Sequence, residues 1–488
     1  MTIPAPAPTA PPPTLLVASN RGPVSFIAED DGSLTLRRGG GGLVSGLTAL
    51  ASGTEALWVC AALKDTDRRA ARAAPGGRLD LDGHDTGGHA VRMLAIDPGT
   101  FQRAYNEVAN STLWFLHHLL FDTPQRPSFD AGFRREWAAY VDYNRVFAQA
   151  LAQDAAPGAK VLVQDYHLSL VPQLLRELRP DLRIAHFSHT PWAPADYYAM
   201  LPDAVGRQVL TGMLGANHIG FHSRRWAVAF LDCCARFLGA PVRREVLEVD
   251  WDGRTTRLAL HPLGVDGESL VVRSRQADVE THLAALREDV GDCTVIVRVD
   301  RTELSKNILR GLQAYRELLR RHPEWHGRVV HLALAYPSRH DLPEYREYTA
   351  AVQRLALEID EEFSTADWRA LDLRVDDDYA RSLAAYRLAD VLIVNPIRDG
   401  MNLVAKEVPV VSDQGFALVL SCEAGVADEF ADYAIMINPY DVSSTADALD
   451  AALRTSPLER ARACADMRKQ AVSLTPQRWF TDQVAGLD

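Results

Sequence analysis

The sequence lacks the features that would assign it to a membrane or to a secretory route. No apolar run approaches the ~18–20 residues needed to span a bilayer. The start, residues 1–13, is rich in Pro and Ala and has neither the basic nor the apolar segment of a secretory signal. We therefore expect residues 1–13 to form a disordered Pro-rich tail and the protein to be cytoplasmic.

Cysteine pairs, net positive charge and the common nucleotide-loop patterns are also missing. The six cysteines include no Cys-x-x-Cys pair, which favours reduced thiols: Cys60, Cys233, Cys234, Cys293, Cys422 and Cys464. The formal net charge of −12 argues against nucleic acid as a partner, although a local cluster of cations could still bind a small anionic substrate. Neither Gly-x-Gly-x-x-Gly nor the Walker pattern occurs, so neither a classical dinucleotide fold nor a P-loop is supported.

What the chain does have is length and an alternating pattern. A chain of 488 residues is too long for one hydrophobic core, so two large domains are expected. Short apolar runs predict strands at Leu15–Ser19, Val161–Gln164, Ile184–Ser188, His218–Phe221, Thr294–Val299, Val329–Ala335, Val391–Val394, Ala417–Ser421 and Ala434–Ile437. Amphipathic spacing predicts helices at Ser169–Leu178 and Ile308–Arg321. Such alternation is typical of parallel sheets covered on both faces.

The strands fall into an early and a late group, separated by the polar stretch Asp266–Gly291. We therefore predict an α/β fold of two doubly wound, Rossmann-like domains that face one another across a cleft. The predicted boundaries are 14–265 for the first domain and 266–471 for the second, with a C-terminal helix at 472–488 packing back on the first. Ligands of such sheets bind beyond the carboxyl ends of the strands.

Two motifs in the first half carry groups that suit a phosphate or a sugar. Ser19-Asn20-Arg21 ends a strand, and the glycine run Gly39–Gly42 leads into a helical segment; its backbone N–H groups could approach an anion, although a surface loop is the alternative. Gln164-Asp165-Tyr166-His167 also ends a strand, where Asp can accept and His can donate hydrogen bonds to sugar hydroxyls. His186 and His189 have an odd offset in strand context, which disfavours a zinc site.

Two motifs in the second half add cations and a turn. Arg301 and Lys306 follow a predicted strand and suit a diphosphate, with a solvated helix start as the alternative; Arg339 lies just past another strand. The run Asn395–Glu407 places a Gly-containing turn between a strand and a helix, and the helical spacing of Asp399 and Glu407 lets both face a cleft. Two carboxylates could instead form a hydrolase acid–base pair, which the sequence does not decide.

These motifs in this order resemble those of the trehalose-6-phosphate synthase family, retaining glycosyltransferases of two-domain GT-B architecture. The resemblance runs from about Leu15 to the C-terminus, and the run from Arg398 to Glu407, Arg-Asp-Gly-Met-Asn-Leu-Val-Ala-Lys-Glu, is its most specific part. It implies synthesis of trehalose 6-phosphate from a nucleoside-diphosphate glucose and glucose 6-phosphate, with the acceptor sites in the first domain and the donor sites in the second. A homo-oligomer stays open, and no nucleic acid or membrane partner is implied.

The resemblance also implies a role for each matching residue. The residues similar to the acceptor site are Arg21, Tyr105, Trp114, Asp165 and Arg339, and those similar to the catalytic set are His189, Arg301, Lys306 and Asp399. The donor would further contact Gly42, Met401, Asn402, Leu403 and Glu407, the last through the ribose. No metal and no cofactor are implied, since Arg301 and Lys306 would neutralise the leaving diphosphate.

Three departures from the family pattern affect these expectations. Where the family commonly has Trp-Phe-Gly-Trp, this chain has Trp58-Val59-Cys60-Ala61, so an acceptor-side aromatic is missing near Ala61. The phosphate motif Asp-Tyr-Ser-Lys-Gly reads Glu303-Leu304-Ser305-Lys306-Asn307. The stretch Thr365–Tyr379, expected to line the base pocket, is rich in Asp; a carboxylate can accept from two guanine N–H groups, so we favour GDP-glucose over UDP-glucose.

Two alternatives stand beside the synthase. A pseudo-glycosyltransferase of the validoxylamine phosphate synthase kind would couple cyclitols on the same fold, but such proteins lack the intact Arg398–Asn402 signature and the histidine that here is His167. A non-catalytic sugar-phosphate sensor would be expected to lose Arg301, Lys306 or Asp399, and all three are present.

Overall fold

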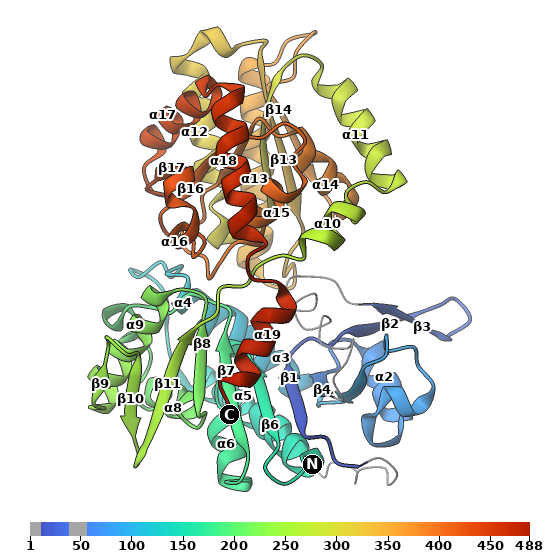
Figure 1. Cartoon of the computed structure of the whole chain (residues 1–488), viewed down its shortest axis with the longest axis vertical. Coiled ribbons are helices and arrows are strands. Elements are labelled where there is room, and N and C mark those ends of the chain that lie inside the picture. The colour runs from blue at the N-terminus through green and yellow to red at the C-terminus, as the bar shows by residue number, and fades with distance from the viewer. Residues whose placement is uncertain (1–10, 39–55) are drawn as a thin grey trace. The chain divides into compact units, whose positions relative to one another are not determined.

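The computed structural model describes residues 11–38 and 56–488, and the chain divides into two compact units. Unit 1 comprises Met1–Pro262 together with Pro476–Asp488, and unit 2 comprises Leu263–Thr475 (Figure 1). Each unit is built around its own sheet, and each is considered by itself.

Unit 1 contains a nine-stranded sheet in the order β5-β4-β1-β6-β7-β8-β11-β10-β9. Its strands are β1 (Leu15–Ser19), β4 (Ala56–Ala61), β5 (Ala90–Leu94), β6 (Lys160–Gln164), β7 (Arg183–Ser188), β8 (His218–Phe221), β9 (Val242–Arg243), β10 (Glu248–Trp251) and β11 (Arg254–Leu260). Pairing is parallel from β5 to β11 and antiparallel at the β11-β10-β9 edge. The strand order reverses between β1 and β6, so these two neighbours end at the point where such sheets bind ligands.

The helices of unit 1 cover this sheet, and a separate hairpin of β2 (Val24–Ala28) and β3 (Leu34–Arg38) lies outside it. The helices are α2 (Asp65–Ala73), α3 (Pro98–Gln102), α4 (Trp114–His117), α5 (Ala131–Asp154), α6 (Val171–Leu178), α7 (Ala195–Tyr198), α8 (Asp203–Leu214), α9 (Arg224–Cys233) and α19 (Pro476–Ala485). A π-helical segment, η3 (Arg103–Leu113), leads directly into α4.

The last helix, α19, belongs to unit 1 although unit 2 precedes it in the chain. It lies beside β6 and β7 (Figure 1), and its Trp479 Nε1 donates to the carbonyl of His261 at 3.0 Å. Arg183 at the start of β7 donates to the carbonyl of Leu487 at 2.7 Å. The final residues of the chain therefore complete the fold of unit 1.

Unit 2 contains a six-stranded, wholly parallel sheet in the order β14-β13-β12-β15-β16-β17. Its strands are β12 (Thr294–Arg301), β13 (Val329–Tyr336), β14 (Leu371–Val375), β15 (Val391–Val394), β16 (Ala417–Ser421) and β17 (Ile435–Ile437). Its helices are α10 (Gly267–Arg273), α11 (Ala277–Val290), α12 (Ile308–Arg321), α13 (Pro343–Phe363), α14 (Tyr379–Leu388), α15 (Leu403–Val411), α16 (Ala427–Phe430), α17 (Val442–Arg454) and α18 (Pro457–Ala471). The strand order reverses between β12 and β15.

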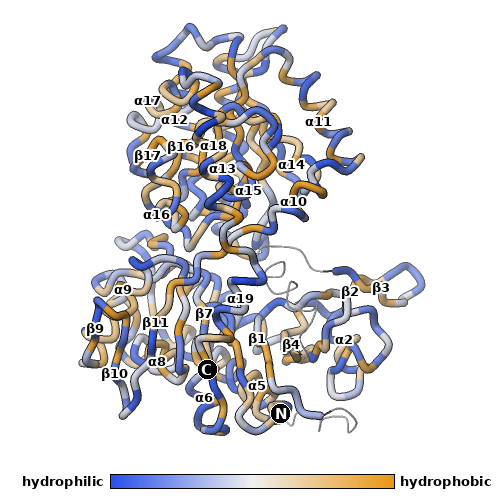
Figure 2. The backbone as a smooth tube through the Cα atoms, in the orientation of Figure 1, coloured by the Kyte–Doolittle hydropathy of each residue, from blue (hydrophilic) through white to orange (hydrophobic). Residues whose placement is uncertain are grey.

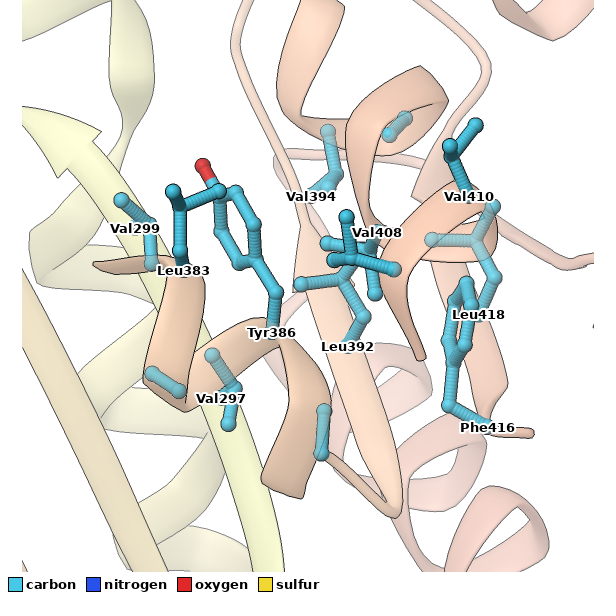
Figure 3. Close-up of a cluster of buried hydrophobic side chains, with 14 of the residues drawn as sticks. Val297, Val299, Leu383, Tyr386, Leu392, Val394, Val408, Val410, Phe416 and Leu418 are labelled. Carbon is cyan, nitrogen blue, oxygen red and sulfur yellow. The ribbon is translucent and has the colours of Figure 1, made fainter. Parts of the chain in front are cut away.

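Apolar side chains cover both faces of this sheet. Alternate residues of β12 point to opposite sides, so that Val297 and Val299 join one core and Ile296 the other. Figure 3 shows the first core, in which α14 and α15 pack on β12, β15 and β16. Along α11 the buried residues recur every three or four positions, and hydrophilic and hydrophobic positions alternate along its tube (Figure 2).

The α/β class with parallel sheets is confirmed. The polar stretch at 266–291, which separates the two predicted groups of strands, forms α10 and α11, two helices of unit 2 whose buried residues are apolar. No described helix has the length and hydropathy that a membrane span requires. All six cysteines are free thiols.

Candidate functional site

The predicted donor residues of unit 2 gather at the carboxyl ends of β12 and β15, the two strands between which the order reverses. Arg301 is the last residue of β12, and Lys306 follows in the loop that leads to α12. Asp399 lies in the turn between β15 and α15. Because a crevice opens between neighbouring parallel strands whose connections leave in opposite directions, this is the expected ligand position of such a sheet.

Lys306 and Asp399 form a direct ion pair in this turn. Lys306 Nζ lies 2.6 Å from Asp399 Oδ2, and Asn402 Nδ2 donates to the same oxygen at 3.2 Å. Burial alone would lower the pKa of Lys306, but Asp399 and Asp300 outweigh it and raise that pKa above its ordinary value. The lysine is therefore fully charged at neutral pH, and it pairs with Asp399, the carboxylate predicted to contact the sugar.

Glu303, which the sequence offered only as a departure from the family motif, joins two of the predicted arginines. It is fully buried, and its Oε1 lies 3.1 Å from Arg301 Nη1 and 3.8 Å from Arg339 Nη1. Ser338 Oγ donates to the same oxygen at 2.8 Å. Burial raises the pKa of Glu303, but Arg301, Arg339 and Lys306 outweigh it and bring the value to about 2. A cation predicted for the diphosphate and one predicted for the acceptor phosphate thus share one carboxylate.

Asn307, at the family's glycine position, has a structural role that the sequence did not reveal. Its φ of 57° is in the left-handed region, which Asn tolerates better than most residues. Its Nδ2 donates to the carbonyls of Asn395, at 3.0 Å, and Pro439, at 2.8 Å. The loop that carries Lys306 is thereby tied to the end of β15.

The predicted donor residues Met401, Asn402 and Leu403 lie at the start of α15, and Glu407 lies within that helix. Asn402 has a φ of 90° and caps the helix by accepting from Ala405 N at 3.1 Å; the buried Met401 precedes it, and Leu403 begins the helix. Asp399 precedes α15, so the helical spacing from which we expected Asp399 and Glu407 to face one cleft does not apply to this pair. Tyr386 Oη, in the core shown in Figure 3, donates to Glu407 Oε2 at 3.3 Å, and burial raises the pKa of Glu407 to about 7.

The predicted base-lining stretch occupies two opposite edges of the sheet. Residues 365–369 precede β14, and Trp368 Nε1 donates to the carbonyl of Val329 at the start of β13, so this part lies at the amino edge, away from Lys306 and Asp399. The reason is that the segment connects α13 to the beginning of a parallel strand. Residues 375–379, by contrast, lie at the carboxyl edge.

In unit 1, Asp165 and His189 lie together after the neighbouring strands β6 and β7. His189 N donates to Asp165 Oδ1 at 3.2 Å, and His186 Nε2 lies 3.2 Å from the carbonyl of Asp165. The two histidines thus approach the same residue, because β7 ends at Ser188 and the strand alternation does not extend to His189. The described side chains that meet with metal-ligand spacing are His322, Glu324 and Asp450, in unit 2.

Two of the remaining acceptor candidates of unit 1, Tyr105 and Trp114, contact residues that follow Asp165. The Tyr105 ring, on η3, stacks on His167 with centroids 5.5 Å apart, and His167 Nδ1 lies 3.8 Å from Asp165 Oδ2. The buried Trp114 ring lies 5.7 Å from that of Tyr166. Arg21 follows β1 and is exposed. The fifth acceptor candidate, Arg339, belongs to unit 2.

Two further positions complete the predicted set. Gly42, with the glycine run and the helical segment after it, lies outside the described residues. Ala61, where relatives commonly have Trp, ends β4 and is 1% exposed. Gly22 packs so closely beside this strand end that an added Cβ would meet Cys60 Sγ at 2.4 Å.

The chain matches glycosyltransferase family 20 over residues 13–488. A trehalose-6-phosphate synthase of Mycolicibacterium gilvum is 34% identical over 490 residues, which cover 96% of this chain and 93% of the relative. A validamine 7-phosphate valienyltransferase of Streptomyces hygroscopicus subsp. jinggangensis is 33% identical over 433 residues, 88% of this chain and 85% of the relative. An α,α-trehalose-phosphate synthase (UDP-forming) from Burkholderia xenovorans, solved in complex with glucose-6-phosphate, superposes with a TM-score of 0.83 at 25% identity, covering 97% of this chain and 99% of that one.

Replacing Glu303 with Gln should destabilise unit 2, because two arginines lose their buried counter-charge. We expect the free energy of unfolding to fall by about 3 kcal/mol in urea titrations, the range for breaking a buried ion pair. Glu317→Gln, which breaks a surface pair with Arg321, is the control and should cost at most about 1 kcal/mol. Equal effects of the two substitutions would contradict the assigned role.

The raised pKa of Glu407 predicts a pH-dependent stability difference. The native state holds the proton up to about pH 7, whereas the ordinary value is 4.5, so ionisation of Glu407 removes stability as pH rises between them. Relative to wild type, Glu407→Gln should therefore gain about 3 kcal/mol of unfolding free energy from pH 4.5 to pH 8. Glu361→Gln, exposed on α13, is the matched control. A constant difference across this window would show that Glu407 ionises normally.

Proposed function

The chain belongs to glycosyltransferase family 20, the trehalose-6-phosphate synthase family, and from this membership we propose that it joins glucose from a nucleoside-diphosphate glucose to glucose 6-phosphate. The product would be α,α-trehalose 6-phosphate, formed with retention of configuration. The observation that best supports this proposal is the cluster of Arg301, Lys306 and Asp399 at the carboxyl ends of β12 and β15.

In the proposed reaction the glucosyl carbon leaves the diphosphate and is attacked by the acceptor hydroxyl on the same face. The bond from C1 to the diphosphate oxygen breaks, the bond to the acceptor oxygen forms, and the hydroxyl proton passes to the departing phosphate. Arg301 and Lys306 would neutralise the charge that develops on that phosphate, and the backbone N–H groups at the start of α15 would add to this. The proposal includes no metal ion.

The Lys306–Asp399 pair suits this task because both partners have a ligand group to bind. Asp399 would accept from hydroxyls of the donor glucose while Lys306 contacts the diphosphate, so one substrate satisfies both charges. Glu303 would hold Arg301 and Arg339 in orientations that reach phosphates. On the acceptor side, Arg21, Asp165, Tyr105 and Trp114 keep the roles that the family match implies.

The similarity to a validamine 7-phosphate valienyltransferase supports a second candidate, the coupling of cyclitols. The intact run from Arg398 to Asn402 and the presence of His167 favour the glucosyl transfer. An assay with cyclitol substrates alongside glucose 6-phosphate separates the two.

Acceptor use should depend on the phosphate. We expect plain glucose to be a very poor acceptor, because Arg339 would lose its ligand. Arg339→Ala should raise KM for glucose 6-phosphate roughly 10- to 150-fold, the value of one or two hydrogen bonds to a charged group, and change KM for the donor far less. Steady-state kinetics with each substrate varied in turn measures both constants. Equal use of glucose and glucose 6-phosphate would refute the proposal.

The donor base tests a finer point, and here we propose a preference for GDP-glucose that rests on Asp377. Asp376 and Asp377 are both exposed, but Asp376 pairs with Arg381 and Asp378 caps α14, so that Asp377 is the carboxylate of this run that we assign to the base. Asp377 and the predicted ribose residue Glu407 both act on Tyr336: after burial, the charges of Glu407, Asp377 and Asp300 raise the pKa of Tyr336, to about 12.

Asp377→Asn should lower kcat/KM for GDP-glucose by roughly 10- to 100-fold and leave that for UDP-glucose nearly unchanged, because only guanine offers two N–H groups to one carboxylate. Asp367→Asn is the matched control, since Asp367 belongs to the same stretch but lies at the amino edge of the sheet. A clear preference of the wild-type enzyme for UDP-glucose would show that the base assignment is wrong.

A further inference from the structure

A buried chain of side-chain amides connects the last helix of the protein to His189. Gln483 on α19 donates from Nε2 to the carbonyl of Trp479 at 3.3 Å. Gln164 Nε2 donates to Gln483 Oε1 at 3.4 Å, and Gln164 Oε1 lies 3.0 Å from His189 Nε2. Both glutamines are at most 1% exposed, so their polar atoms depend on these contacts. We call this chain the amide relay.

The orientation of both amides in the relay is determined by the Trp479 carbonyl, at the end away from His189. The carbonyl of Trp479 can only accept, so Gln483 must turn its NH₂ group toward it and its oxygen toward Gln164. Gln164 must then turn its NH₂ group toward Gln483 and its own oxygen toward His189. An oxygen facing His189 Nε2 requires a hydrogen on that nitrogen. The reversed amide orientations would place acceptors against acceptors at Trp479.

A neutral imidazole with hydrogen on Nε2 has a lone pair on Nδ1. Among the described residues no hydrogen bond to His189 Nδ1 is present, and the side chain is half-buried. Burial, with His222 and His186 nearby, keeps the pKa of His189 well below its ordinary value, so the ring is neutral at physiological pH. The carboxylate of Asp165 accepts from the backbone N of His189 rather than from its ring.

We propose that Gln483 is a positioning residue that, through Gln164, fixes His189 as the tautomer with hydrogen on Nε2, so that Nδ1 accepts a hydrogen bond from a hydroxyl of the donor sugar. This inference rests on the proposed function for the identity of the ligand, but the tautomer itself does not depend on it.

Substitutions of Gln483 separate the effect of the amide orientation from the effect of side-chain packing. Gln483→Met keeps the volume but removes the anchor, so Gln164 can turn over and His189 can take either tautomer; we expect kcat/KM to fall roughly 10- to 100-fold. Gln483→Glu should restore most of the activity, since a carboxyl oxygen still accepts from Gln164 in either protonation state. Gln477→Met makes the same change at an exposed position of α19 and should behave as wild type.

The tautomer is read directly from the ¹⁵N chemical shifts of histidine-labelled enzyme, with the His189 signals assigned by their loss in His189→Asn. We expect Nε2 protonated in wild type and in Gln483→Glu, and a mixture in Gln483→Met. Protonated Nδ1 in wild type, or an unchanged tautomer in Gln483→Met, would overturn the proposal whether or not the enzyme forms a disaccharide phosphate. The expected tautomers in an enzyme that transfers no glucose would instead refute the proposed function and leave the relay intact.

Discussion

Arg298 connects the two strands of unit 2 between which the strand order reverses, and the predicted donor residues depend on that connection. It is 1% exposed, its Nε donates to Asp300 at 2.9 Å, and its Nη2 donates to the Lys306 carbonyl at 2.9 Å and to Asn395 at the end of β15. Parallel strands have no hairpin to align their ends, so side chains must do so. Gly311 allows this arrangement, since a Cβ there would lie 2.2 Å from Arg298 Nη1.

The charges near this connection are already compensated within unit 2. Lys306 pairs with Asp399, Arg298 with Asp300, and Glu303 with Arg301 and Arg339. In the proposed function, a diphosphate that binds here would therefore replace protein carboxylates with phosphate oxygens as the partners of these cations. Such exchange lowers the net gain in affinity but keeps each cation in place, and positioned charge is what stabilises a leaving group in a transition state. The overall charge of −12 is consistent with this local arrangement.

The sequence was sufficient to predict the buried parallel strands and to place the candidate residues at the ends of those strands. β1, β8, β15 and β16 have the predicted bounds because continuous apolar runs form strands covered on both faces. β14 (Leu371–Val375) was missed because it is an edge strand, whose Asp372 and Arg374 pair with each other and break the apolar run. The partners of the site residues were missed for another reason: Glu303 meets Arg339, and Asn307 meets Pro439, only through the tertiary fold. No local spacing encodes such contacts.

The amide relay shows a second kind of control, over direction rather than charge. A glutamine amide is neutral and can present either its oxygen or its NH₂ group to a neighbour. Two glutamines in series therefore have a defined orientation only when one end contacts a group that can only accept or only donate. The Trp479 carbonyl is such a group, because it belongs to the backbone of α19. That helix follows unit 2 in the chain and packs on unit 1. The tautomer of His189 therefore depends on the packing of α19 against β6. The family signature lies among residues that would contact ligand, whereas the tautomer of His189 depends on Gln483, a residue outside every motif that the sequence offered.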